Sequence, residues 1–122
     1  MNGLSASGWV FAGAGLGAVC RYWLGTLIAN RSFPWSTLCV NLLGGLLIGI
    51  VASSMEADSP SRNFWMVGVL GGFTTFSAFS IELVSLFNSK AYGAAFSYFL
   101  ATNVGAIGFC ALGYWLRATF AR

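Results

Sequence analysis

The segment Gly71-Gly72-Phe73-Thr74-Thr75-Phe76-Ser77-Ala78-Phe79-Ser80 interrupts a long apolar stretch, residues 64–87. Paired glycines weaken a helix, and Thr or Ser hydroxyls can bind backbone groups that lose their helical partners. Within a membrane, unwound backbone persists only where protein or a water-filled cavity covers it. The segment therefore predicts a broken membrane helix whose first half ends near Gly71 and whose second half begins near Thr74 or Thr75. Such a break is a candidate binding site, because carbonyls from one half and N–H groups from the other point into it.

Apolar residues dominate the whole chain. Of its 122 residues, 57% are hydrophobic and only 7% are charged, whereas roughly 25% are charged in soluble domains. Four apolar stretches each approach the roughly 20 residues that cross a bilayer, at residues 8–29, 36–54, 64–87 and 94–116. We therefore predict an all-α integral membrane protein, with one transmembrane domain over residues 1–122 and a third helix broken near residues 71–75.

The few charges are spread along the chain, which has six basic and three acidic residues and a net charge of +3. They form no run, so nucleic-acid binding is not expected. Four spans would place three basic residues on each side of the membrane: Arg62, Arg117 and Arg122 on one, and Arg21, Arg31 and Lys90 on the other. Because this balance gives no orientation by the positive-inside rule, we expect dual topology and an antiparallel homodimer. Insertion in one direction under a weak bias is the alternative.

The polar residues within the first two apolar stretches could each have a structural role or a role in a pore. Arg21 lies about two turns before the end of the first stretch, where it could snorkel to the interface or concentrate anions beside an aqueous vestibule. Asn41, Gly45 and Gly49 share one helical face, which Thr37 extends by a turn. That face suits either a seam for helix packing or the wall of a pore.

After the break, Phe76 and Phe79 lie on one helical face, and Glu82 is the only acid within any predicted span. The two rings could contact lipid or neighbouring helices, or turn their positive edges toward an anion. Glu82 could lie at a pore mouth or carry protons. Tyr98 and Thr102 add two hydroxyls on one face of the last stretch.

These groups favour permeation over catalysis. The chain has no His, no cluster of metal-ligating residues and no nucleophile–base pair, so we do not expect an enzyme. Neutral amides, hydroxyls and ring edges can bind an anion well enough to dehydrate it and still release it. We therefore expect a narrow pore for an anion. The alternatives are a proton-coupled antiporter, for which Glu82 is the available acid, and a non-conducting membrane assembly subunit.

Three strings carry a resemblance to a known family: GGFTTFSAFS at 71–80, TLCVNLLGG at 37–45 and GLGAVCRYW at 15–23. They resemble the Fluc, or CrcB, family of fluoride channels, and the likeness extends over all four apolar stretches. It implies a multi-pass protein of the prokaryotic inner membrane that exports toxic fluoride. It also implies a dual-topology, antiparallel homodimer with two parallel pores.

The resemblance assigns pore residues by motif. Phe76 and Phe79 match the paired pore phenylalanines, Asn41 matches the pore asparagine, and Ser77 matches a pore hydroxyl. Tyr98 and Thr102 correspond by spacing to pore-lining hydroxyls of the last helix.

The resemblance also implies a structural sodium ion at the centre of the dimer, held by the backbone carbonyls of Gly71 and Thr74. Arg21 and Glu82 match vestibule positions. The sequence departs from the family pattern at Ala78, where the family commonly has Thr, and this change could reduce the rate of permeation.

Overall fold

The computed structural model describes residues 2–29 and 32–121, and all regular structure in these residues is helical. The helices, in chain order, are α1 (Gly3–Leu27), α2 (Trp35–Ser54), α3 (Pro60–Arg62), the π-helical η1 (Asn63–Leu70), α4 (Gly71–Phe73), α5 (Phe76–Asn88) and α6 (Tyr92–Phe120). Together they give four candidate spans, with α3, η1, α4 and α5 forming the third. This confirms the predicted four-span architecture. Arg31 and Arg122, which entered the charge comparison, lie outside the described residues.

Local signals explain where the helices start. Asn2 caps α1, because its side-chain oxygen accepts a hydrogen bond of 2.9 Å from the Ser5 N–H. α1 therefore begins at Gly3 rather than near residue 8. Ser59 caps α3 in the same way, and Pro60 occupies the first helical position, where its missing N–H costs nothing. Hydropathy alone does not mark these ends, because capping groups extend a helix beyond its apolar stretch.

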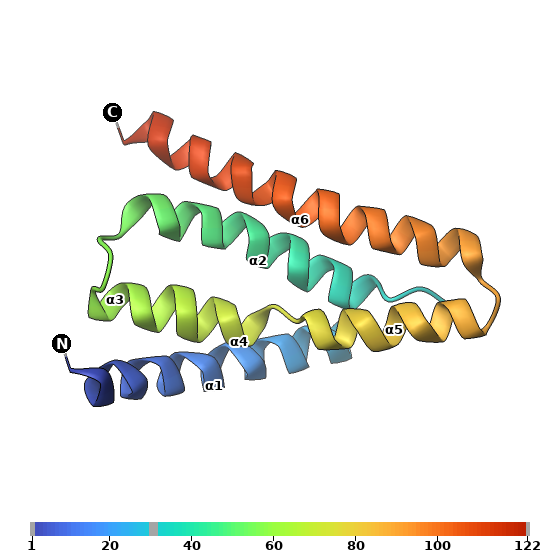
Figure 1. Cartoon of the computed structure of the whole chain (residues 1–122), viewed down its shortest axis with the longest axis horizontal. Coiled ribbons are helices and arrows are strands. Elements are labelled where there is room, and N and C mark those ends of the chain that lie inside the picture. Colours follow the sequence, from blue (N-terminus) through green and yellow to red (C-terminus); the bar gives the residue numbers. More distant parts are fainter. Residues whose placement is uncertain (1, 30–31, 122) are drawn as a thin grey trace.

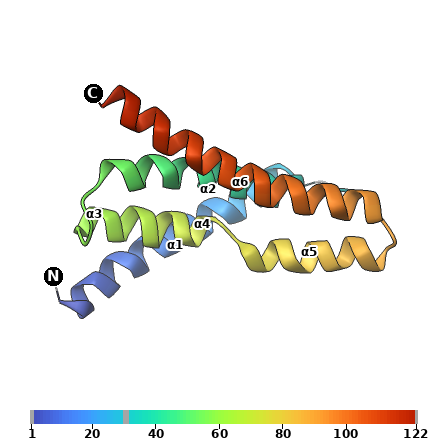
Figure 2. The same ribbon diagram turned by 45° about the horizontal axis from the view of Figure 1, so that its top comes forward.

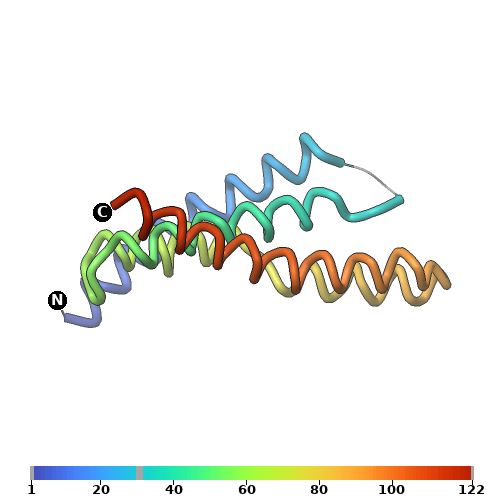
Figure 3. Tube along the Cα trace, turned by 90° about the horizontal axis from the view of Figure 1, so that it is seen from above, coloured from blue at the N-terminus to red at the C-terminus, as the bar shows by residue number. Residues whose placement is uncertain are grey.

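The break lets the third span change its partner. The chain termini and the 55–59 connection lie at one end of the bundle, and the other two connections lie at the opposite end (Figure 1). α2 packs along α6, while η1 and α4 pack on α1. After the break the chain crosses over, and α5 runs along α6 instead (Figures 2 and 3). Each half of the third span thus has its own neighbour.

The glycine pair does not make the break. Gly71 and Gly72 are helical, and the helix ends only after Phe73, so the prediction of an end near Gly71 was wrong. Gly72 instead permits close packing, since a Cβ there would overlap the Ala14 carbonyl oxygen and lie 2.9 Å from the Ala14 Cα. Gly13 and Gly17 face the same seam from α1. Small residues at these two positions therefore let α1 and the third span approach each other closely.

The substitution Gly17→Ala tests this seam. A Cβ at residue 17 would overlap the Val69 carbonyl oxygen and lie 2.8 Å from the Phe73 nitrogen, both rigid backbone atoms. We expect the variant to lose about 1–3 kcal/mol of stability, measured as a lower melting temperature of the purified protein in detergent. Gly8→Ala is the control, because among the described residues no side chain and no backbone of another segment lies within 4 Å of a Cβ at that position. Equal melting temperatures for the two variants would contradict the proposed seam.

Candidate functional site

The unwound residues are Thr74 and Thr75, and their hydroxyls replace lost helical hydrogen bonds. The Thr74 hydroxyl donates to the Leu70 carbonyl at 3.0 Å. The Thr75 hydroxyl oxygen accepts from the Ala78 N–H at 3.1 Å and so caps α5. This confirms that the second half-helix begins at the threonine pair. The hydroxyl chemistry of Thr, rather than the flexibility of Gly, makes the break possible in this chain.

Asn41 on α2 binds the unwound backbone of the break. Its Nδ2 donates to the Thr75 carbonyl at 3.0 Å, and its Oδ1 accepts from the Thr75 N–H at 2.9 Å. Asn41 and Thr75 are both buried. One side chain thus satisfies both backbone groups of an unwound residue, which would otherwise be costly at membrane depth. One turn further along α2, Gly45 lies against the Ala106 backbone on α6, so the same face is also a packing seam.

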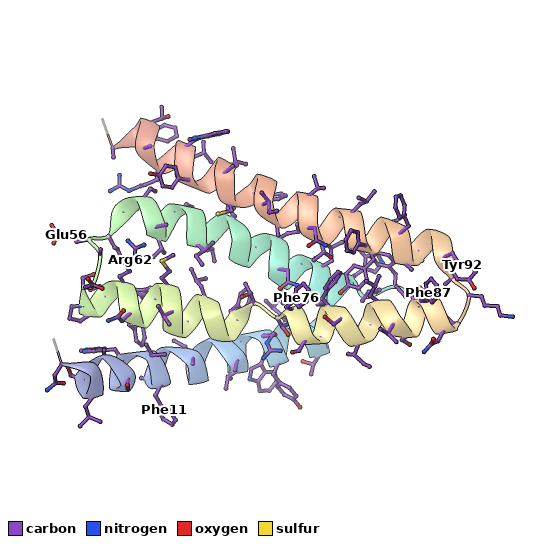
Figure 4. The ribbon with its side chains drawn as sticks, in the orientation of Figure 1. Phe11, Glu56, Arg62, Phe76, Phe87 and Tyr92 are labelled. Carbon is purple, nitrogen blue, oxygen red and sulfur yellow. The ribbon has the colours of Figure 1, made fainter. Side chains whose placement is uncertain are left out.

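A cavity of about 290 Å³ lies beside the break. Phe76, at the start of α5 (Figure 4), lines it and is 73% exposed in the single subunit. The Thr102 hydroxyl is buried and has no hydrogen-bond partner in the part of the chain that the structure describes. The other lining residues are Asn41, Gly44, Gly45, Ile48, Thr74, Thr75, Asn103, Ala106 and Ile107. The cavity therefore combines apolar walls with neutral polar groups, and one of its lining residues carries a buried hydroxyl without a partner among the described residues.

Glu82, which follows Phe79 on α5, forms a second polar cluster with Thr37 and Tyr98. Its two carboxylate oxygens accept hydrogen bonds from the Thr37 hydroxyl at 2.8 Å and the Tyr98 hydroxyl at 2.6 Å. Thr37 and Glu82 also line a cavity of about 330 Å³ among the ends of α1, α2 and α5. The cluster lies between three helices and faces this opening. The sequence pattern places Thr37 on the Asn41 face, and it gives no sign of the contact with Glu82 on another helix.

Phe79 connects the two polar regions. It is 2% exposed, and its ring centroid lies 5.4 Å from that of Phe76 and 5.1 Å from that of Tyr98. The Phe79 and Tyr98 rings are nearly perpendicular, at 83°, so the edge of one faces the other. Phe33 extends the row, with its centroid 5.5 Å from that of Tyr98. Nothing in the local sequence singled out Phe33, because its partner lies on a distant helix.

The remaining predicted residues surround the break. Ser77 is exposed in the single subunit, and its Oγ lies 3.2 Å from the Thr75 Oγ1. Gly71 is exposed on α4, and Thr74 is extended with φ −76° and ψ 156°. Arg21 donates from its Nε to the Gly72 carbonyl at 3.3 Å, whereas Glu82 accepts from Thr37 and Tyr98. The structure thus joins Asn41, Phe76 and Thr102 at one cavity, and Glu82 and Tyr98 at a second cluster.

Comparison with known proteins gives a consistent family match. Residues 8–114 match the family described as "CrcB-like protein, Camphor Resistance (CrcB)". The chain is 45% identical to the "Fluoride-specific ion channel FluC" of Agrobacterium fabrum, over 80% of this chain and 84% of that protein. It is 41% identical to the protein of the same name from Rhodospirillum rubrum, over 88% of this chain and 87% of that one. It is 38% identical to the protein of the same name from Phocaeicola vulgatus, over 88% of this chain and 93% of that protein.

Replacement of Asn41 by Leu tests whether this side chain holds the break. The variant leaves the buried N–H and C=O of Thr75 without partners, so we expect it to lose about 1–3 kcal/mol of stability. Thermal unfolding in detergent measures the loss. Asn103→Leu is the matched control, since the Asn103 amide donates to the Phe99 carbonyl of its own helix. A melting temperature for Asn41→Leu as high as that of the control would refute the role of Asn41.

Proposed function

The chain belongs to the CrcB-like family, and on that premise we propose that it is a passive, fluoride-selective ion channel. Residues 8–114 carry the family match, and the relatives described above are named fluoride-specific ion channels. Its four apolar helices make it a multi-pass membrane protein. These relatives favour the channel over the antiporter and the non-conducting assembly subunit.

The observation that carries the proposal is the free hydroxyl of Thr102. A buried hydroxyl without a partner costs about 1–3 kcal/mol, so its presence in the break cavity needs a reason. Asn41 shares this cavity and uses one hydrogen of its Nδ2 for Thr75, which leaves the second hydrogen available. Two residues with neutral donors therefore line the same space. They suit a small anion that must lose its water and then leave again.

The aromatic row gives the anion a route from the break cavity to the Glu82 cluster. Phe76 and Phe79 offer ring edges, which attract an anion without a fixed opposite charge. Beyond them, the hydroxyls of Thr37 and Tyr98 are already bound to Glu82. An anion that arrives there competes with the carboxylate for these hydroxyls.

The functional unit that we propose is an antiparallel homodimer in the inner membrane of a prokaryote, where it exports toxic fluoride. Phe76 and Gly71 are exposed beside unwound backbone at membrane depth in the single subunit. Such backbone needs a protein cover. A second copy of opposite orientation would supply it, and the even division of basic residues permits both orientations.

The break also fits the structural sodium ion that the family resemblance implies. The Gly71 carbonyl belongs to the last turn of α4, where carbonyls lack helical partners, and Thr74 adds a carbonyl from extended backbone. These hard oxygen ligands suit Na⁺, and two subunits would supply four of them. Within this chain, α4 and the Thr74–Thr75 segment would hold the ion at the dimer centre.

The substitution Thr102→Val separates function from stability. Valine has nearly the same shape but lacks the unpartnered hydroxyl, so the melting temperature should stay the same or rise. Fluoride efflux from liposomes, read with a fluoride electrode, should fall by about tenfold, which corresponds to one lost hydrogen bond of roughly 1.4 kcal/mol. In the control Thr119→Val, the lost hydroxyl binds the Trp115 carbonyl of its own helix. Undiminished efflux in Thr102→Val would remove Thr102 from the ion path.

A further inference from the structure

Arg21 lies at the end of the glycine seam on α1. Gly13, Gly17 and Arg21 are four residues apart and therefore follow one stripe of the helix. Along this stripe the α1 backbone touches η1 and α4, because a Cβ at Gly13 or Gly17 would overlap backbone atoms of the third span. The contact brings the partly buried Arg21 side chain to the Gly72 carbonyl, which accepts a hydrogen bond of 3.3 Å from Nε.

The Gly72 carbonyl needs such a donor. In a continuous helix it would accept from the N–H of residue 76, but α4 ends at Phe73 and α5 begins at Phe76. A cation at the carboxyl end of a helix is favoured because the last carbonyls carry partial negative charge. Glu82, the only acid within a span, is bound to Thr37 and Tyr98 rather than to Arg21. The arginine is therefore directed at the break.

Two side chains consequently hold the break from different helices. Arg21 on α1 binds the carbonyl before it, at Gly72, and Asn41 on α2 binds both backbone groups of Thr75 within it. Together they fix the two ends of the Phe73–Thr74 crossover. This arrangement leaves the Gly71 and Thr74 carbonyls for the sodium ion of the proposed channel.

We propose that Arg21 is a positioning residue for permeation, which fixes the carboxyl end of α4 through its Nε–H and thereby sets the geometry of the break. The inference rests on the proposed fluoride channel. It differs from a vestibule role, in which Arg21 acts as a free charge that concentrates anions. A long-range charge acts through salt-dependent electrostatics, whereas a positioning residue acts through one hydrogen bond.

Three substitutions separate the two roles. Arg21→Gln keeps an N–H donor at the same number of bonds from Cα but removes the charge. Arg21→Lys keeps the charge and moves the donor one bond further, and Arg21→Met removes both. Each variant is measured by fluoride efflux from liposomes at low and high salt. Hydrogen–deuterium exchange of the 70–80 segment in detergent reports the geometry of the break independently of transport.

For a positioning residue, Arg21→Gln should keep efflux within about threefold of the unsubstituted protein, while Arg21→Lys and Arg21→Met should lose about tenfold or more at both salt concentrations. The Thr75 and Ala78 amides should exchange faster in the Lys and Met variants only. The opposite pattern would overturn the proposal: efflux kept by Lys and lost by Gln and Met at low salt, no difference from the unsubstituted protein at high salt, and unchanged exchange in all three.

Arg62→Met is the matched control. Arg62 also binds a carbonyl at the end of a helix, since its Nη1 donates to Met55 at 3.2 Å. It lies at the far end of the bundle, beside the 55–59 connection (Figure 4). This variant should change neither efflux nor exchange at 70–80. If the unsubstituted protein passes no fluoride, the proposed function fails, whereas the exchange data still decide whether Arg21 positions the break.

Discussion

Two hydrogen bonds between the Asn41 amide and the Thr75 backbone are the interaction on which the rest of this structure depends. They lower the free-energy cost of unwound backbone within a membrane, so that the helix can end at Phe73 and begin again at Phe76. The interruption lets the first half of the third span pack on α1 and the second half on α6. It also opens a cavity that combines backbone groups, an amide and a free hydroxyl.

The polar groups around the break in the third span are nearly all neutral, and this neutrality suits a channel. A fixed cation inside the path would bind a small anion too firmly, while apolar walls alone would exclude it. The two charged side chains near the path are both engaged, Arg21 by the Gly72 carbonyl and Glu82 by two hydroxyls. The anion would therefore meet amide and hydroxyl donors and ring edges, each of which binds weakly and releases easily.

The sequence predicted the four spans and the existence of a break, because both depend on local composition. It placed the end of the first half-helix near Gly71, before the observed end at Phe73. The pair Gly71 and Gly72 is typical of a helix break, yet Gly72 allows close packing against Ala14, a contact made with another helix. The partners of Glu82 and Phe33 were missed for the same reason, since each pairs with residues of other helices. The family motifs identified the candidate residues, and the structure showed which of them share a cavity.

The most direct test of the central claim is ion release from liposomes that contain the purified protein, with fluoride or chloride inside and an electrode for each ion. The account predicts rapid fluoride release that needs no proton gradient, with chloride retained. Release of both ions at similar rates would contradict selectivity by the neutral break cavity, and retention of both would contradict the channel itself.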